Sequence, residues 1–201
     1  MRVPPVSCWV HATVEVRTSP IAGRGLFATA DLPAGTVVSR LGGRLVDTAE
    51  LHRMLANADA GRAPYVDTIV VAEDRHLVVE PGSDSRFGNH SCDPNLGWVD
   101  EYTLATMADV PAGHELVSDY AMSTADAEYV LRCHCPSYRC RQMVAGDDWR
   151  IPQLQTRYRG WWVPYVQGLV DGVVADVTES PSATGARPAA PARPPSSRRG
   201  P

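Results

Sequence analysis

The sequence predicts a mainly β protein, a β-rich α+β fold. Short runs of β-branched and apolar residues recur through the first 120 residues, and turns rich in Gly, Pro and Asp separate them. Helical periodicity is confined to one short segment near residue 50 and to the chain after residue 120. A length of 201 residues, 44% of them hydrophobic and 21% charged, fits one globular domain with an appendage.

The expected strands lie mostly before residue 120. Residues 13–18 alternate apolar and polar side chains, which is typical of a half-buried strand. The turn at Gly23-Arg24-Gly25 leads into another apolar run. The remaining runs are predicted as a strand that Gly42-Gly43 ends, two hairpins and a last strand: 36–41, 65–72 with 76–80, 96–99 with 102–107, and 115–119.

Few helices are expected. Asp47-Thr-Ala-Glu50 reads as a capping box that opens a short helix, with Leu51 and Leu55 on one face and Gly61 as its stop. After Tyr120 the pattern predicts three more helical segments, which are 124–131, 153–158 and a segment that follows Trp161 and ends near Val174. Residues 178–201 are dominated by Pro, Ala, Ser, Gly and Arg and are expected to form a disordered tail.

Composition excludes several classes of protein. No apolar stretch is long enough for a membrane-spanning helix, and the first residues lack the apolar core of a secretory signal. Five cysteines are too few, and odd in number, for a disulfide scaffold. We therefore expect a protein that is not secreted and has no membrane partner, cytoplasmic or, in a eukaryotic source, nuclear.

Charge is unevenly distributed. Residues 12–120 hold eight arginines against sixteen acidic side chains, a formal charge of −8, while the whole chain carries −4. Duplex nucleic acid is therefore an unfavourable direct partner, and a basic partner is the favoured one. All 19 basic residues are arginine, so the chain offers no lysine side chain of its own.

Arg86-Phe-Gly-Asn89-His90-Ser-Cys92-Asp-Pro-Asn95 is the most informative segment. His90 and Cys92 could form a base and a thiol nucleophile. That reading requires a regular strand, whereas Asp-Pro-Asn favours a turn, in which Asn89 and Asn95 would satisfy backbone groups.

Three cysteines crowd into Cys133-His-Cys135-x4-Cys140. A tetrahedral zinc site needs four ligands, and this segment supplies three, because His134 between two cysteines would be strained as an adjacent ligand. The spacing alone leaves Cys8 and Cys92 as candidates for the fourth ligand. Glu115-Leu-Val-Ser-Asp119-Tyr120 and Gly23-Arg24-Gly25 are weak signals when each is taken alone.

Taken together and in this order, the four segments resemble a SET-domain protein-lysine methyltransferase with a short post-SET zinc motif. Residues 86–95 match R-F-x-N-H-S-C-x-P-N at every defined position, and the other three match GxG, E-L-x-x-D-Y and C-x-C-x4-C-R. Two departures are Leu41, where many members have the tyrosine of Y-x-G, and Pro136, which replaces a common glycine. The first bears on the lysine channel and on the number of methyl groups added, more than on the transfer centre.

The resemblance implies a SET domain at 12–120 and a post-SET zinc motif at 129–145, and the helical segments predicted from the sequence pattern form an extension at 146–177. The SET fold consists of small β-sheets with a pseudoknot, which would bring Asn89 and His90 to Tyr120. It implies zinc held by four cysteines, which are Cys92, Cys133, Cys135 and Cys140. The donor would be S-adenosylmethionine, bound by Gly23, Arg24, Gly25, Arg86, Asn89, His90 and Tyr120.

By the same resemblance, Tyr120 would be the catalytic residue, and Tyr65 and Trp149 are candidate walls of the site, although core aromatics are the commoner reading of such side chains. The expected activity is methyl transfer to the side-chain amine of a lysine in a protein substrate, possibly a basic histone-like protein. The alternative is a catalytically inactive, zinc-stabilised SET-like binding module, which would have the same fold and metal.

Overall fold

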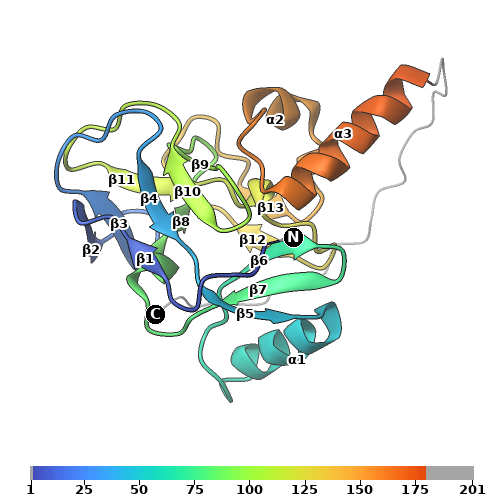
Figure 1. The fold of residues 1–201 in the computed structure, drawn as a ribbon, viewed down its shortest axis with the longest axis horizontal. Coiled ribbons are helices and arrows are strands. Elements are labelled where there is room, and N and C mark those ends of the chain that lie inside the picture. The colour runs from blue at the N-terminus through green and yellow to red at the C-terminus, as the bar shows by residue number, and fades with distance from the viewer. Residues whose placement is uncertain (1, 180–201) are drawn as a thin grey trace.

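The computed structural model describes residues 2–179, and its largest element is an eight-stranded sheet (Figure 1). Seven strands form a path in the order β1-β4-β10-β9-β11-β3-β2, and β8 pairs with β11 beside that path. The bounds of these strands are β1 Trp9–Val10, β2 Val14–Thr18, β3 Arg24–Ala28, β4 Val37–Arg40, β8 Asn89–His90, β9 Leu96–Trp98, β10 Thr103–Thr106 and β11 Glu115–Ser118. The predicted β-rich fold is confirmed.

A smaller sheet carries the long helix of the N-terminal half. Its strands are β5 (Gly43–Val46), β7 (Arg75–Val79) and β6 (Thr68–Ala72), in the order β5-β7-β6. Helix α1 (Thr48–Asp59) packs beside this sheet at one end of the molecule (Figure 1). The Asp47 side chain accepts a hydrogen bond from the Glu50 amide at 2.7 Å, so the predicted N-terminal cap is confirmed.

The segment after Tyr120 forms a two-stranded ribbon and two helices. The ribbon pairs β12 (Val130–Arg132) with β13 (Met143–Ala145). Helices α2 (Pro152–Arg157) and α3 (Pro164–Glu179) lie at the end of the molecule away from α1 (Figure 1). Buried side chains of these helices join the same apolar core as the main sheet, and these are Leu154, Val166 and Val170. The segments next to the helices add Trp149, Tyr158, Trp162 and Val163 to that core.

Several expectations about local structure are wrong. Residues 124–131 do not form a helix, because β12 takes the end of this segment into the ribbon with β13. The strand at 115–118 is therefore not the last one. Gly43 opens β5 where we expected only a break, because it pairs with Val79 of β7. Glycine is needed there, since a Cβ would overlap the Val78 carbonyl oxygen.

The C-terminal helix is longer than expected, since it runs to Glu179 rather than ending near Val174. Of the tail predicted over 178–201, residues 180–201 lie outside the described residues. Among residues 2–179, no helix combines the length and the apolar character that crossing a bilayer requires.

Candidate active site

Tyr120 lies where β11 meets the Asn89–His90 strand. β8 runs parallel to β11, with Asn89 opposite Val117 and His90 opposite Ser118. The Tyr120 amide donates a hydrogen bond to His90 Nδ1 at 3.1 Å, and the two rings meet edge to face with centroids 5.2 Å apart. The Tyr120 hydroxyl donates to the Gly88 carbonyl at 2.8 Å. The expected approach of His90 to Tyr120 is confirmed.

The Tyr120 hydroxyl is neutral in this environment. Burial raises the pKa of Tyr120 well above its ordinary value, and the neighbouring Tyr65 and Asp67 raise it further. Its proton is directed at Gly88, so the phenolic oxygen keeps a lone pair for another donor. Burial also raises the pKa of Asp67 to about 6, against the opposing effects of the Arg86 charge and the Thr68 amide.

The glycine-rich turn before β3 is attached to Asn89. The Asn89 amide nitrogen donates to the Ala22 carbonyl at 3.2 Å, to the Arg24 carbonyl at 3.0 Å and to Glu115 Oε1 at 2.7 Å. The Arg24 guanidinium lies 4.1 Å from the centroid of the Phe87 ring. Gly23 adopts a positive φ of 46°, a conformation that favours glycine. The turn and the Asn89–His90 strand therefore form one unit.

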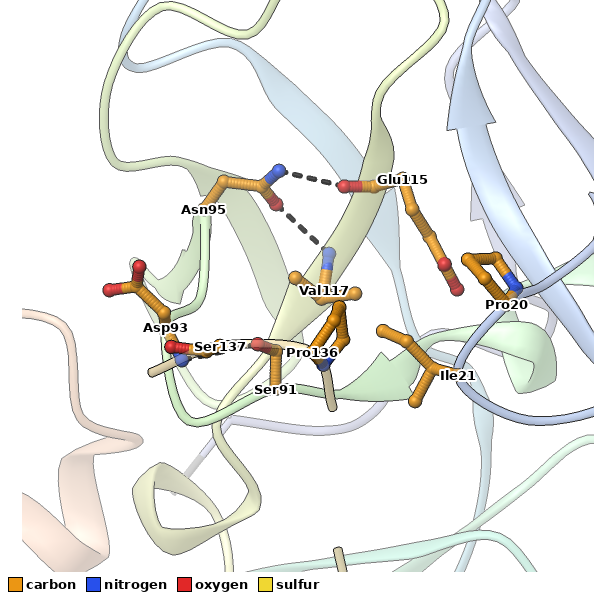
Figure 2. A pocket seen from close by; sticks show the side chains of 9 residues that line it. All are labelled: Pro20, Ile21, Ser91, Asp93, Asn95, Glu115, Val117, Pro136 and Ser137. Atoms are coloured by element: carbon orange, nitrogen blue, oxygen red, sulfur yellow. Dashed lines mark hydrogen bonds between the residues drawn. The ribbon is translucent and has the colours of Figure 1, made fainter. Parts of the chain in front are cut away.

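A hollow of about 330 Å³ opens beside this unit (Figure 2). Pro20 and Ile21 face it from the turn before Gly23, and Pro136 and Ser137 face it from the cysteine segment. The rest of the wall comes from Glu115 and Val117 of β11 and from Ser91, Asp93 and Asn95 of residues 86–95, the signature segment. The Asn95 side chain ties this wall together, since it donates to the Glu115 carbonyl at 2.8 Å and accepts from the Val117 amide at 2.9 Å.

Four cysteine sulfurs converge, one from residues 86–95 and three from residues 133–140. The Sγ atoms of Cys92, Cys133, Cys135 and Cys140 all lie within 4.8 Å of one another. The Cys92–Cys133 separation is 3.8 Å, which matches the edge of about 3.8 Å that a tetrahedron with Zn–S bonds of about 2.3 Å requires. Cys8 lies elsewhere, with its thiol against the Gly42 backbone.

The environment of these sulfurs fits a bound metal ion. The amide of Arg141 donates to Cys92 Sγ at 3.3 Å, and the amide of Cys135 donates to Cys133 Sγ at 3.4 Å. Donors of this kind stabilise thiolates. Burial raises the pKa of the Cys92 thiol to about 11, so a divalent cation would supply the charge that keeps the sulfurs deprotonated together. The cluster is compatible with a zinc site.

His90 stands between Tyr120 and this cluster. Burial lowers the pKa of His90 to about 4, although the Asp119 carboxylate opposes that change, so the ring is neutral near pH 7. Nδ1 accepts the Tyr120 amide proton, which assigns the ring proton to Nε2. Nε2 lies 3.3 Å from Cys92 Sγ, a position from which it can donate to that sulfur.

A buried ionic network holds the cysteine segment against β11. The Asp119 side chain is fully buried and accepts two hydrogen bonds from the Arg141 guanidinium, at 2.6 and 2.8 Å. Asp119 also accepts from the Tyr158 hydroxyl at 2.9 Å and the Ala121 amide at 3.0 Å. Arg141 Nε donates to Asp148 at 3.0 Å. The network therefore joins the end of β11, the cysteine segment and the residues on either side of α2.

The other residues singled out in the sequence lie in different surroundings. The guanidinium of Arg86 lies 5.6 Å from the Phe87 ring and attracts the Asp67 carboxylate. Tyr65 is 55% exposed and electrostatically coupled to Tyr120, whereas Trp149 is only 6% exposed and belongs to the apolar core. Tyr65 is thus near the site, and Trp149 serves packing.

No role was predicted from the sequence for Asp67, Tyr129, Arg141, Asp148 or Tyr158. Asp119 is a defined residue of E-L-x-x-D-Y, and Arg141 is one of C-x-C-x4-C-R, so these motifs could have indicated both residues. Asp67 and Tyr129 approach Tyr120 from loops, and Tyr158 reaches Asp119 across 39 residues. No periodicity or spacing marks those three positions.

Comparison with known proteins decides the family. Residues 23–121 match the model of the SET domain. The chain belongs to the SET-domain family. The matched SET region includes the GxG turn, the signature segment and Tyr120, which are the parts that the fold brings together.

Relatives and a solved structure agree with this assignment. This chain is 31% identical over 146 residues to human "Histone-lysine N-methyltransferase SETD2". The matched region covers 69% of this chain and 6% of that protein. The chain is 33% identical over 143 residues to "Histone-lysine N-methyltransferase trithorax" of Drosophila virilis, covering 65% and 4%. The chain thus spans only a small part of the curated relatives that it matches.

The fold is also that of a solved structure described as "Structural basis for the product specificity of histone lysine methyltransferases". The TM-score is 0.50 at 22% identity, over 64% of this chain and 54% of that one.

Proposed function

We propose that this SET protein transfers a methyl group from S-adenosylmethionine to the side-chain amine of a lysine in another protein. The observation that carries the proposal is the convergence of the GxG turn, Asn89, His90 and Tyr120 in one place. Relatives named histone-lysine N-methyltransferases support it.

The donor would be held by the turn at Gly23, Arg24 and Gly25 and by Asn89 and His90. Turn carbonyls occupy the amide nitrogen of Asn89, so its oxygen remains available to a donor such as the ammonium of the cofactor's amino-acid end. Arg86, three residues before Asn89 and near enough to Asp67 to oppose the rise in the pKa of that carboxyl, would contribute positive charge for the carboxylate of that end. When bound, the cofactor supplies an electrophilic methyl group on a sulfonium.

Tyr120 would position the acceptor rather than remove its proton. Its raised pKa and its hydrogen bond to Gly88 make the hydroxyl a poor base. The free lone pair can accept a hydrogen bond from the lysine amine and hold its nitrogen in line for attack, and such positioning can lower a barrier by several kcal/mol. A lysine has a pKa of about 10.4, so forming the neutral amine at pH 7 costs roughly 4–5 kcal/mol. A nearby sulfonium and a dry site both reduce that cost.

We infer that Cys92, Cys133, Cys135 and Cys140 hold one zinc ion. Cys92 lies two residues after His90, so the metal would fix the cysteine segment 133–140 next to the cofactor turn. Pro136 and Ser137, which lie between Cys135 and Cys140, line the hollow beside that turn. Metal binding would therefore complete one wall of the site.

The favoured substrate is a basic, lysine-containing segment. Residues 12–120 carry a formal charge of −8, which attracts a positive segment. The chain has no lysine side chain, so the acceptor lysine must come from another molecule.

Incubation with methyl-labelled S-adenosylmethionine and purified core histones would test the proposal. Mass spectrometry should locate the label on lysine, and Tyr120→Phe should remove most transfer while cofactor affinity, measured by calorimetry, changes by less than a few-fold. Binding of cofactor and zinc without transfer to any basic protein would favour the inactive binding module instead. Near-normal turnover in Tyr120→Phe would contradict the role given to that hydroxyl.

A further inference from the structure

The Glu115 side chain joins two parts of the proposed cofactor site, which are Asn89 and the turn before β3. Glu115 opens β11, and its side chain extends toward Pro20 and Ile21 (Figure 2). Oε1 accepts from the Asn89 amide nitrogen at 2.7 Å, and Oε2 accepts from the Ser19 hydroxyl at 2.9 Å. One carboxylate thus contacts both the signature segment and the start of the glycine-rich turn.

The contact with Asn89 fixes the orientation of that amide. All three groups around the Asn89 nitrogen are acceptors, namely the Glu115 carboxylate and the carbonyls of Ala22 and Arg24. A carboxylate cannot donate, and neither can a carbonyl, so an amide flipped by 180° would place its oxygen against three acceptors. The arrangement therefore directs Asn89 Oδ1 away from these groups.

The contact with Ser19 holds the turn in shape. The Ser19 hydroxyl donates to Glu115 and accepts from the amides of Ile21 at 2.9 Å and Ala22 at 3.3 Å. The Ser19 amide also donates to the Gly23 carbonyl at 2.9 Å. The backbone of the GxG turn is therefore anchored to β11 through one side chain.

Gly25 provides independent evidence for this geometry. A Cβ at this position would overlap Glu115 Oε1 and approach Asn89 Nδ2 to 3.1 Å. The second glycine of the GxG turn is thus needed so that Glu115 can reach Asn89, and not for a left-handed backbone, since Gly25 has no positive φ.

We propose that Glu115 is a positioning residue, which holds Asn89, and through Ser19 the turn beside it, so that Asn89 Oδ1 faces the amino-acid end of the cofactor. The inference rests on the proposed function. A charged hydrogen bond of this kind exceeds a neutral one in strength, so its loss should be measurable in ligand affinity.

Calorimetry with two nucleosides would test this role. S-adenosylhomocysteine has the amino-acid end, whereas methylthioadenosine lacks it. Glu115→Leu should weaken S-adenosylhomocysteine at least tenfold and methylthioadenosine less than threefold. Glu115→Gln, whose amide oxygen can accept the Asn89 hydrogen bond, should bind both within threefold of wild type.

A second variant protects the test against misfolding of Glu115→Leu. Gly25→Ala should displace the Glu115 carboxylate and give the same selective loss, while zinc content remains at the wild-type value. Equal weakening of both nucleosides, or no weakening of either, would overturn the positioning role. Failure of the wild-type protein to bind S-adenosylhomocysteine would overturn both this inference and the proposed function.

Discussion

Replacing Arg141 by methionine should destabilise the protein by about 3 kcal/mol, the lower end of what breaking a buried ion pair costs. The Asp119 side chain is 0% exposed and that of Arg141 16%, so the variant leaves a carboxylate in the interior without its counter-ion. Asp119 keeps hydrogen bonds from Tyr158 and Ala121, which is why we choose the lower end. For a domain of this size the loss corresponds to a fall in Tm of about 6–12 °C.

Arg139→Met is the matched control, two residues away in the same segment. Arg139 pairs with Asp93 at 3.4 Å, but the two side chains are 38% and 49% exposed, so the loss should be at most about 1 kcal/mol. Urea unfolding at saturating zinc, followed by tryptophan fluorescence, would compare the two variants. Metal content should stay unchanged in Arg141→Met, because the backbone amide that contacts Cys92 remains. The reasoning is refuted if Arg141→Met loses no more stability than Arg139→Met.

Four further outcomes are expected. Elemental analysis should find one zinc per chain in the wild type and in Cys8→Ser but little in Cys92→Ser; the reverse pattern would contradict the ligand assignment. Because the folded-state pKa of Asp67 is about 6, above its ordinary value of about 3.9, wild-type stability should rise relative to Asp67→Asn as pH falls from 6 to 4, by at most about 3 kcal/mol; parallel pH profiles in urea unfolding would contradict this. Affinity for a basic lysine peptide should fall as salt rises, because salt screens its attraction to the acidic residues of 12–120; salt-independent affinity would count against the electrostatic model. Deleting residues 181–201, an arginine-containing segment that could compete with the substrate for those acidic residues, should leave turnover equal or higher; lower turnover would also count against that model.

The parts of the site that sequence could predict are those in which chemistry requires particular residue types at fixed spacing. The segment 86–95 and the cysteine run carry such a requirement, and the structure brings Cys92 and the tail cysteines within 4.8 Å. The start of α1 could also be predicted, because the Asp47 cap is a local interaction.

The parts that could not be predicted depend on contacts between distant segments. Residues 124–131 contain good helix formers, yet Val130 pairs with Ala145, and Gly146 packs directly on the Asp126 backbone. Tertiary pairing therefore overrides local propensity there. Asp119 accepts a hydrogen bond from the Tyr158 hydroxyl, a contact that no local sequence pattern predicts.

The pairing of β3 with β11 also constrains how the protein can fold during synthesis. Leu26 and Phe27 lie opposite Leu116 and Glu115, so the edge of β3 that faces them has no partner until those residues are made. At about 5–20 residues per second, the interval between Gly25 and Tyr120 lasts about 5–20 s. The β2–β3 hairpin would therefore spend seconds with backbone N–H and C=O groups on one edge of β3 unpaired, and no fragment that ends before Tyr120 can contain the assembled site.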